Sequence, residues 1–130
     1  MDGRSVGDEV YLDDNGFVHI TYHGDQDKRS GQRTIDRAMT IMKHLEKDDE
    51  SIYILADIRD MGEHTPTARQ VGLKARETMP YRKMAIIVSK SDPFTAKISR
   101  VMTSMSQRSK EIGYFSSEKQ ATEWLRRHGS

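Results

Sequence analysis

The sequence predicts an α/β domain built on a mixed sheet, in which an N-terminal β-hairpin precedes alternating helices and strands. Three observations predict this fold class. Two segments of period two flank an Asn-Gly turn, several later segments carry apolar residues at helical spacing, and short continuous apolar runs lie between those segments. Alternating strands and helices are typical of sheets with parallel strands and right-handed crossovers. The expected order is β-β-α-β-α-β-α-β-α.

Two different spacings of apolar side chains predict the hairpin and the first helix. Apolar and polar side chains alternate in residues 9–13 and 18–22, which indicates two strands with one buried face. The intervening Asp13-Asp14-Asn15-Gly16 is typical of a tight turn. From about Ser30 the apolar residues follow the helical period instead. The stripe of this helix comprises Ile35, Ala38, Met39, Met42 and Leu45.

Three apolar runs predict the remaining strands, and good start signals predict the remaining helices. The runs cover residues 51–57, 84–88 and 112–115, and the first suits a strand that is covered on both faces. Thr65-Pro66 and Asp92-Pro93 each place a capping oxygen before a proline at the first helical position. A capping box at 117–120 starts the last helix. Residues 58–64 are expected to form a loop.

The helix that starts at Asp92-Pro93 is expected to bury the apolar residues that fall on one of its faces. These residues are Phe94, Ile98, Val101, Met102 and Met105. Methionine fills irregular gaps well, so core packing is the preferred interpretation of the methionines on the predicted helices.

Length and composition restrict the class of protein. The chain of 130 residues fits one domain, expected over residues 9–128 after a disordered N-terminus at 1–8. Lys and Arg (21) nearly balance Asp and Glu (20), so the chain has no strong net positive charge that would favour binding of nucleic acid. Apolar runs are too short to span a bilayer, no secretory signal precedes them, and cysteine is absent. We therefore expect a cytoplasmic protein without membrane insertion.

Familiar catalytic and cofactor motifs do not occur. The sequence has no phosphate-binding glycine motif and no Gly-x-Ser-x-Gly nucleophile elbow. Its five histidines, at 19, 23, 44, 64 and 128, do not have the spacing of metal ligands. We expect no metal and no cofactor, and we rank an enzyme of unrecognised type last among the functions considered.

Several short motifs resemble the STAS-like domains of sulfate transporters and anti-sigma-factor antagonists. The resemblance starts at Ile54-Leu55-Ala56-Asp57-Ile58-Arg59 and continues through the helix start at residues 65–69 and the strand at 84–88. It ends with residues 114–125, which are similar to the aromatic strand and Ala-x-x-Trp-Leu helix of a divergent, SpoIIAA-like bacterial group. The resemblance covers about Glu9 to Arg127 and implies a STAS/SpoIIAA-like fold.

The resemblance also implies a regulatory role in bacterial signalling. In STAS domains a Ser or Thr at the start of the helix after this strand is phosphorylated by a partner kinase, and the added charge makes or breaks a complex. Here His64-Thr65-Pro66-Thr67 replaces the usual Asp-Ser pair, so Thr65 and Thr67 are the candidate phosphorylation sites. The structural alternative is that Thr65 caps the helix and Thr67 is a first-turn residue.

Two surfaces are candidates for contact with a partner. The first is the charged strand end and helix start, where ligands gather in open α/β sheets. It comprises Asp57, Arg59, Asp60, Glu63, His64 and Arg69. The second is a basic patch of Lys97, Arg100 and Arg108 on the helix that follows Asp92-Pro93, where Lys97 and Arg100 share a face and Arg108 lies about two turns further along it. Both have an ordinary alternative, namely solvated polar residues with weak ion pairs.

Two functions are therefore expected ahead of catalysis. The first is a non-catalytic interaction module whose partner is another protein, such as a kinase or an anti-sigma-type regulator, and the residues leave dimerisation open. The second is a carrier of a small ligand or lipid, because STAS-like domains share their architecture with lipid-binding α/β domains.

Overall fold

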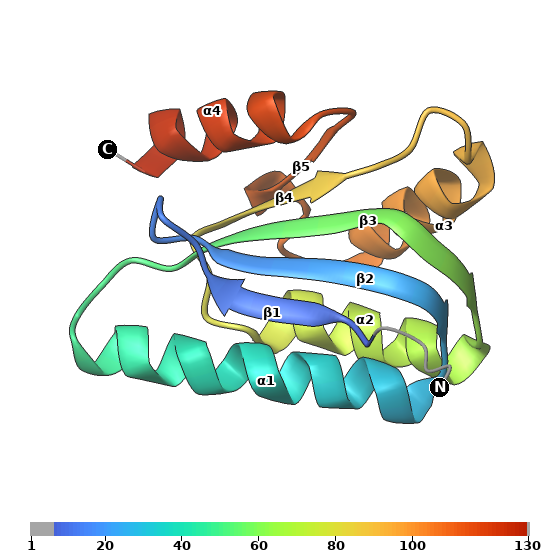
Figure 1. Ribbon diagram of the computed structural model, residues 1–130, viewed down its shortest axis with the longest axis horizontal. Coiled ribbons are helices and arrows are strands. Elements are labelled where there is room, and N and C mark those ends of the chain that lie inside the picture. The colour runs from blue at the N-terminus through green and yellow to red at the C-terminus, as the bar shows by residue number, and fades with distance from the viewer. Residues whose placement is uncertain (1–6, 130) are drawn as a thin grey trace.

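The computed structural model describes residues 7–129 and confirms the predicted fold class (Figure 1). Five strands form one sheet in the order β1-β2-β3-β4-β5. Most of the expected disordered N-terminus lies outside the described residues. Asp8 is an exception and corrects that prediction, because its carboxylate accepts hydrogen bonds from the His23 backbone N–H at 2.8 Å and from Thr34 Oγ1 at 2.7 Å.

The N-terminal hairpin forms as predicted. Strand β1 (Glu9–Leu12) pairs antiparallel with β2 (Val18–Gln26). In the turn, Asp13 Oδ1 accepts hydrogen bonds from the backbone N–H groups of Asn15 and Phe17, both at 2.9 Å. Gly16 has φ +80, a conformation that glycine adopts without steric cost. The Asx-Gly turn therefore sets the register that places Val18 and Ile20 in the core.

Helices cover both faces of the sheet. The parallel strands β3 (Tyr53–His64), β4 (Lys83–Ile87) and β5 (Ile112–Phe115) alternate with α1 (Lys28–Lys47), α2 (Pro66–Thr78) and α3 (Pro93–Met105). Strand order rises steadily from β2 to β5, so right-handed crossovers place these three helices on one face. A 3-10 turn, Ser109–Glu111, precedes β5, and α4 (Glu118–Gly129) packs on the opposite face (Figure 1).

Alternating side chains of the central strands build two cores. On β3, Ile54 and Ala56 face α1 and α2, whereas Tyr53 and Leu55 face α4, where Leu125 is fully buried. Burial on both faces explains the continuous apolar run in the sequence. The predicted caps are also present, since Thr65 Oγ1 accepts from Ala68 N–H at 3.1 Å and Asp92 Oδ1 accepts from Thr95 N–H at 3.2 Å.

Residues 58–64, predicted as a loop, are instead the second half of β3. This half pairs with β2 as far as Gln26 opposite His64, with two irregularities in register. Strand β4 ends opposite Asp57, so the extension has a neighbour on one side only. A continuous apolar run is typical of a strand that is covered on both faces, and this ribbon lacks one, so its polar sequence resembles that of a loop.

Helix α3 turns a different face inward from the one predicted. Three of the aligned apolar side chains are exposed, with Phe94 at 70%, Val101 at 51% and Met105 at 63%. Polar Thr95, Ser99 and Thr103 are buried instead. The helical period identifies a stripe but does not decide which stripe turns inward. Here the choice follows from hydrogen bonds that hold the polar stripe against neighbouring elements.

Candidate functional site

A cavity of about 100 Å³ lies between the sheet and helices α1, α2 and α3. Small residues on the facing helices, Gly31 on α1 and Ala68 and Ala75 on α2, leave the space that larger side chains would occupy. The walls are mostly apolar. The apolar side chains that line it include Ile20, Ile35, Ile54, Met61, Val71 and Ile86.

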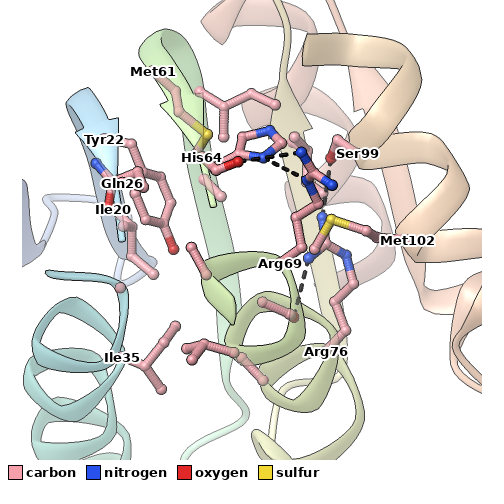
Figure 2. A pocket seen from close by; sticks show the side chains of 18 of the residues that line it. Ile20, Tyr22, Gln26, Ile35, Met61, His64, Arg69, Arg76, Ser99 and Met102 are labelled. Atoms are coloured by element: carbon pink, nitrogen blue, oxygen red, sulfur yellow. Dashed lines mark hydrogen bonds between the residues drawn. The ribbon is translucent and has the colours of Figure 1, made fainter. Parts of the chain in front are cut away.

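One wall carries Arg76 from α2, which neutral groups hold in place (Figure 2). Its Nε donates to Thr103 Oγ1 at 3.1 Å, Nη2 donates to Ser99 Oγ at 3.0 Å, and Nη1 donates to the Gly72 carbonyl at 3.1 Å. Ser99 and Thr103 are one turn apart on α3, so they meet the guanidinium side by side. These contacts explain why the polar stripe of α3 faces inward.

Tyr114 of β5 completes this hydroxyl network. Its phenol oxygen lies 2.9 Å from Ser99 Oγ and 2.6 Å from Thr103 Oγ1, and its hydrogen is donated to the Ser99 carbonyl at 2.7 Å. The serine and threonine hydroxyls must therefore donate to the phenol oxygen and accept from Arg76. Every member is neutral except Arg76, so the network positions the guanidinium without neutralising it.

His64 and Arg69 form a second polar pair on the cavity wall (Figure 2). Arg69 Nε donates to His64 Nδ1 at 3.0 Å, and Nη2 donates to the His64 carbonyl at 3.2 Å. An accepting Nδ1 requires the neutral imidazole. Burial, followed by the charge of Arg69, lowers the pKa of His64, which favours this neutral form.

Tyr22 lies across the cavity from the two arginines (Figure 2). Burial raises the pKa of its phenol to about 12, so Tyr22 is a neutral donor at physiological pH. Its hydroxyl has no hydrogen-bond partner within residues 7–129. The neighbouring Gln26 is already engaged, because its amide nitrogen donates to Asp8 Oδ1 at 3.1 Å.

The side chains that line the cavity carry a net positive charge. Its charged residues are Arg69 and Arg76, and none of the described lining residues is Asp or Glu. Both arginines are half-buried, and a guanidinium that loses part of its hydration beside apolar walls favours an anion that compensates its charge. The arrangement therefore suits a small molecule with an apolar body and a polar or anionic head.

The structure separates the six residues predicted as a partner surface. His64 and Arg69 line the cavity, whereas Asp57 lies among side chains that face α4. Arg59 Nη2 donates to Asp57 Oδ2 at 2.7 Å and Nε donates to Oδ1 at 3.0 Å. Burial raises the pKa of Asp57, but these hydrogen bonds outweigh that effect and hold it below the usual value.

The other two predicted surface residues, Asp60 and Glu63, lie on the ribbon formed by β2 and β3. Asp60 Oδ2 lies 2.6 Å from His23 Nδ1, and Glu63 donates its backbone N–H to Asp25 Oδ1 at 2.9 Å. The loop expected to gather the six residues is a strand, whose side chains alternate between faces. They therefore do not form one continuous surface.

Thr65 and Thr67, the candidate phosphorylation sites, are exposed at the start of α2. Thr65 Oγ1 accepts the capping hydrogen bond and shares a second hydrogen bond with Thr67 Oγ1 at 3.1 Å. The cap predicted as the structural alternative is thus present. Their phosphorylation stays a prediction.

The predicted basic patch is corrected at Arg108. Lys97 and Arg100 are exposed on α3, but the helix ends at Met105 and the chain then turns. Arg108 is directed to another part of the molecule, where it contacts Glu111 and Tyr81. The prediction assumed that the helix continued for another turn.

Sequence reasoning missed Arg76 and Tyr22, which make the cavity wall polar, and Tyr114, which holds Ser99 and Thr103. The one available signal was the spacing of Thr95, Ser99 and Thr103, which puts three hydroxyls on one helix face. Within residues 7–129, no group of three or more His, Asp or Glu side chains is arranged to hold a metal ion. In the same part of the chain, no helix combines the length and apolarity needed to cross a membrane.

Comparisons with known proteins agree with this architecture. The family model described as SpoIIAA-like matches residues 17–126. A solved structure from Shewanella loihica PV-4, an uncharacterised protein of the DUF3478 family with a SpoIIAA-like fold, has a TM-score of 0.64. The two are 18% identical, and the match covers 96% of this chain and 98% of that one. Comparison with the curated proteins gave no match.

Proposed function

This chain belongs to the SpoIIAA-like family, and from that premise we propose that it is a STAS-type binding domain, without catalytic activity, that takes a small amphipathic ligand into its cavity. The observation that carries the proposal is the composition of the cavity wall. Apolar side chains surround a few convergent polar groups, which is typical of small-molecule sites. The carrier function, expected second after the interaction module, therefore becomes the first.

The unpartnered hydroxyl of Tyr22 supports a bound ligand. A tyrosine in an apolar setting usually directs its hydroxyl to a hydrogen-bond partner. Tyr22 lines the cavity and has no such partner among the described residues. A polar ligand atom would supply one.

The same groups support binding rather than catalysis. The hydroxyls of Ser99 and Thr103 are committed to Tyr114 and Arg76, so neither is poised next to a base as a nucleophile. His64 accepts a hydrogen bond from a cation, and its lowered pKa keeps it neutral. Such groups recognise a ligand, and they favour the non-enzymatic role expected from the sequence.

Native mass spectrometry of protein purified from its own host tests the proposal directly. We expect a small non-covalent mass, which organic solvent releases. The Gly31→Leu variant should lose that mass because its side chain starts next to the cavity, where a Cβ would lie 3.8 Å from Val71 Cγ1. Gln32→Leu, at the exposed neighbouring position, should keep it. A bare chain that also gains no thermal stability from any amphipathic probe contradicts the proposal.

We infer a second candidate function, a regulatory interaction with another protein, from the exposed start of α2. Thr67 is exposed and lies two residues before Arg69, which lines the cavity. A phosphate there would place about two negative charges close to that arginine. A kinase or an anti-sigma-type regulator remains the expected partner, in the cytoplasm, and a homodimer remains open. Phosphopeptide mapping of native protein that finds Thr65 and Thr67 always unmodified contradicts the phosphoregulated form of this role.

A further inference from the structure

We propose that the cavity selects a short-chain monocarboxylate, whose carboxylate binds end-on to Arg76 while its alkyl chain occupies the apolar part of the cavity. This inference rests on the proposed function, since it names the chemical class of the ligand. It follows from a count of donors on Arg76, from the charges around that guanidinium and from the size of the cavity.

The donor count leaves Arg76 ready for a carboxylate. A guanidinium has five N–H groups. Three are used, by Thr103 at Nε, by Ser99 at Nη2 and by Gly72 at Nη1. One N–H therefore remains on each terminal nitrogen, without an acceptor in the described part of the chain. Two parallel N–H groups on neighbouring nitrogens match the two oxygens of a carboxylate.

The charges around Arg76 favour an anion. No ion pair joins Arg76 to any carboxylate within residues 7–129, and its three protein acceptors are neutral. Arg100 adds another cation nearby, with its guanidinium carbon 5.3 Å from the centroid of the Tyr114 ring. A monoanion would balance the charge of Arg76, and this compensation is strong where apolar walls limit solvation.

Tyr22 provides the third contact. Its hydroxyl has no hydrogen-bond partner among residues 7–129, and Tyr22 and Arg76 face the same cavity (Figure 2). A neutral phenol donates one hydrogen bond, so it can bind a carboxylate oxygen that also accepts from the guanidinium. Arg69 is engaged with His64 through two of its nitrogens, and we assign it the lesser role of attracting the anion.

The cavity limits the length of the chain. A void of about 150 Å³ accommodates the six carbon atoms of benzene, so on the same scale about 100 Å³ takes an alkyl chain of roughly four carbon atoms. Ile20, Ile35 and Ile54 on its walls favour an unbranched or singly branched alkyl chain. Butyrate to hexanoate fits this space, and longer chains would have to leave it.

Isothermal titration calorimetry with matched probes tests the inference. The probes are sodium acetate, butyrate, hexanoate and decanoate, with hexanol, hexylamine and hexyl phosphate for comparison. We expect hexanoate to bind at least about tenfold more tightly than hexanol, because charge-assisted hydrogen bonds are strong. Acetate, decanoate, hexylamine and hexyl phosphate should all bind more weakly than hexanoate.

Variants then assign the head-group site. Arg76→Gln should lower hexanoate affinity at least about tenfold and leave hexanol affinity unchanged, and Arg76→Lys should rescue only part of the loss. Tyr22→Phe removes a hydroxyl that has no partner in the described part of the chain, so it should weaken hexanoate binding several-fold without loss of stability. Arg33→Gln, at an exposed position on α1, is the matched control. Retained hexanol binding shows that a variant is folded.

The outcomes separate this inference from the proposed function. Equal affinity for hexanol and hexanoate overturns carboxylate selection but keeps a ligand-binding cavity. Tighter binding of hexyl phosphate assigns the site to phosphates and also overturns the inference. If wild-type protein binds none of the seven probes, both the inference and the proposed function are contradicted.

Discussion

The guanidinium carbon of Arg108 lies 3.9 Å from the centroid of the Tyr81 ring, so the cation faces the aromatic side chain. The same guanidinium donates to the carbonyl oxygens of Met79 and Tyr81 and to Glu111 Oε1 at 2.6 Å. It thereby satisfies backbone acceptors just after α2 and fixes the segment that leads into β4. A residue predicted to contact a partner holds the fold together instead.

Replacing Arg108 should therefore destabilise the protein. Arg108→Ala removes the cation–π contact and leaves two partly buried carbonyls without a donor, and we expect a loss of roughly 2–4 kcal/mol in the free energy of unfolding. Lys97→Ala, at an exposed position, should change it by less than about 0.5 kcal/mol. Urea unfolding at pH 7 measures both, and similar values for the two variants contradict the structural role.

Two glycines should respond in opposite directions to alanine. A Cβ at Gly31 would lie 3.8 Å from Val71 Cγ1, an ordinary contact, so Gly31→Ala should stabilise α1 by about 0.5–1 kcal/mol. A Cβ at Gly62 would collide with Asp25 Oδ1 and lie 3.2 Å from the Asp25 backbone nitrogen. We expect Gly62→Ala to cost roughly 1–3 kcal/mol. Thermal unfolding of both variants checks the signs, and stabilisation by Gly62→Ala contradicts this packing.

His64 should make the protein less stable in acid. Burial and Arg69 lower its pKa in the folded state, whereas the unfolded chain binds a proton near pH 6.5. The stabilisation that neutral His64 provides is fully present above pH 6.5 and is lost as pH falls toward the folded-state pKa. In urea titrations, the stability difference between wild type and His64→Gln should shrink from pH 7.5 to pH 5.5. A constant difference contradicts a buried neutral histidine.

His23 should show the opposite dependence on pH. The ring N–H groups of His23 donate hydrogen bonds to Asp60 on β3, at 2.6 Å, and to Glu9 on β1, at 2.7 Å; these bonds raise its pKa, and burial opposes them only in part. Its stabilisation is therefore present below the unfolded value of about 6.5 and is lost as pH rises through the folded-state pKa. His23→Gln should be destabilising at pH 6 and close to neutral at pH 9. NMR titration of the imidazole gives an independent reading, and a pKa at or below 6.5 contradicts the prediction.

The N-cap of α2 should contribute to stability whether or not it is modified. Thr65→Ala removes the acceptor for Ala68 N–H and should cost about 1 kcal/mol. Thr65→Ser keeps the acceptor and should lower the free energy of unfolding by only a few tenths of a kcal/mol. Thr67→Ala removes a hydroxyl that caps no backbone group and serves as the exposed control. Equal stability of all three variants in urea shows that the cap is energetically unimportant.

The sequence predicted the elements well where local chemistry decides the structure. The useful signals were the Asx-Gly turn, the capping residues before proline and the two hydrophobic periods, all of which depend on neighbours a few residues away. They predicted the hairpin, the helix starts and the central strands. The family resemblance rested on these same elements, and the match over residues 17–126 confirms it.

The candidate site was less predictable, because its residues come from distant parts of the chain. Tyr22, Arg76, Ser99 and Tyr114 lie on four different elements, and no local pattern around any of them predicts that they meet. Of the six residues predicted as a surface, only His64 and Arg69 line the cavity. Residues that are close in the sequence do not all lie close in space here, because successive side chains of β3 point to opposite faces of the sheet.

The sequence by itself determined the order of strands and helices, the hairpin turn and the side chains of the central core, because short-range sterics and hydrophobic periods encode them. Only the tertiary structure decided that β3 continues to His64 and that α3 buries Thr95, Ser99 and Thr103 rather than Phe94, Val101 and Met105. The reason is that an apolar stripe specifies burial only when a partner surface is available. On this face of the protein, Arg76 and Tyr114 offer hydrogen-bond partners, so the polar stripe turns inward.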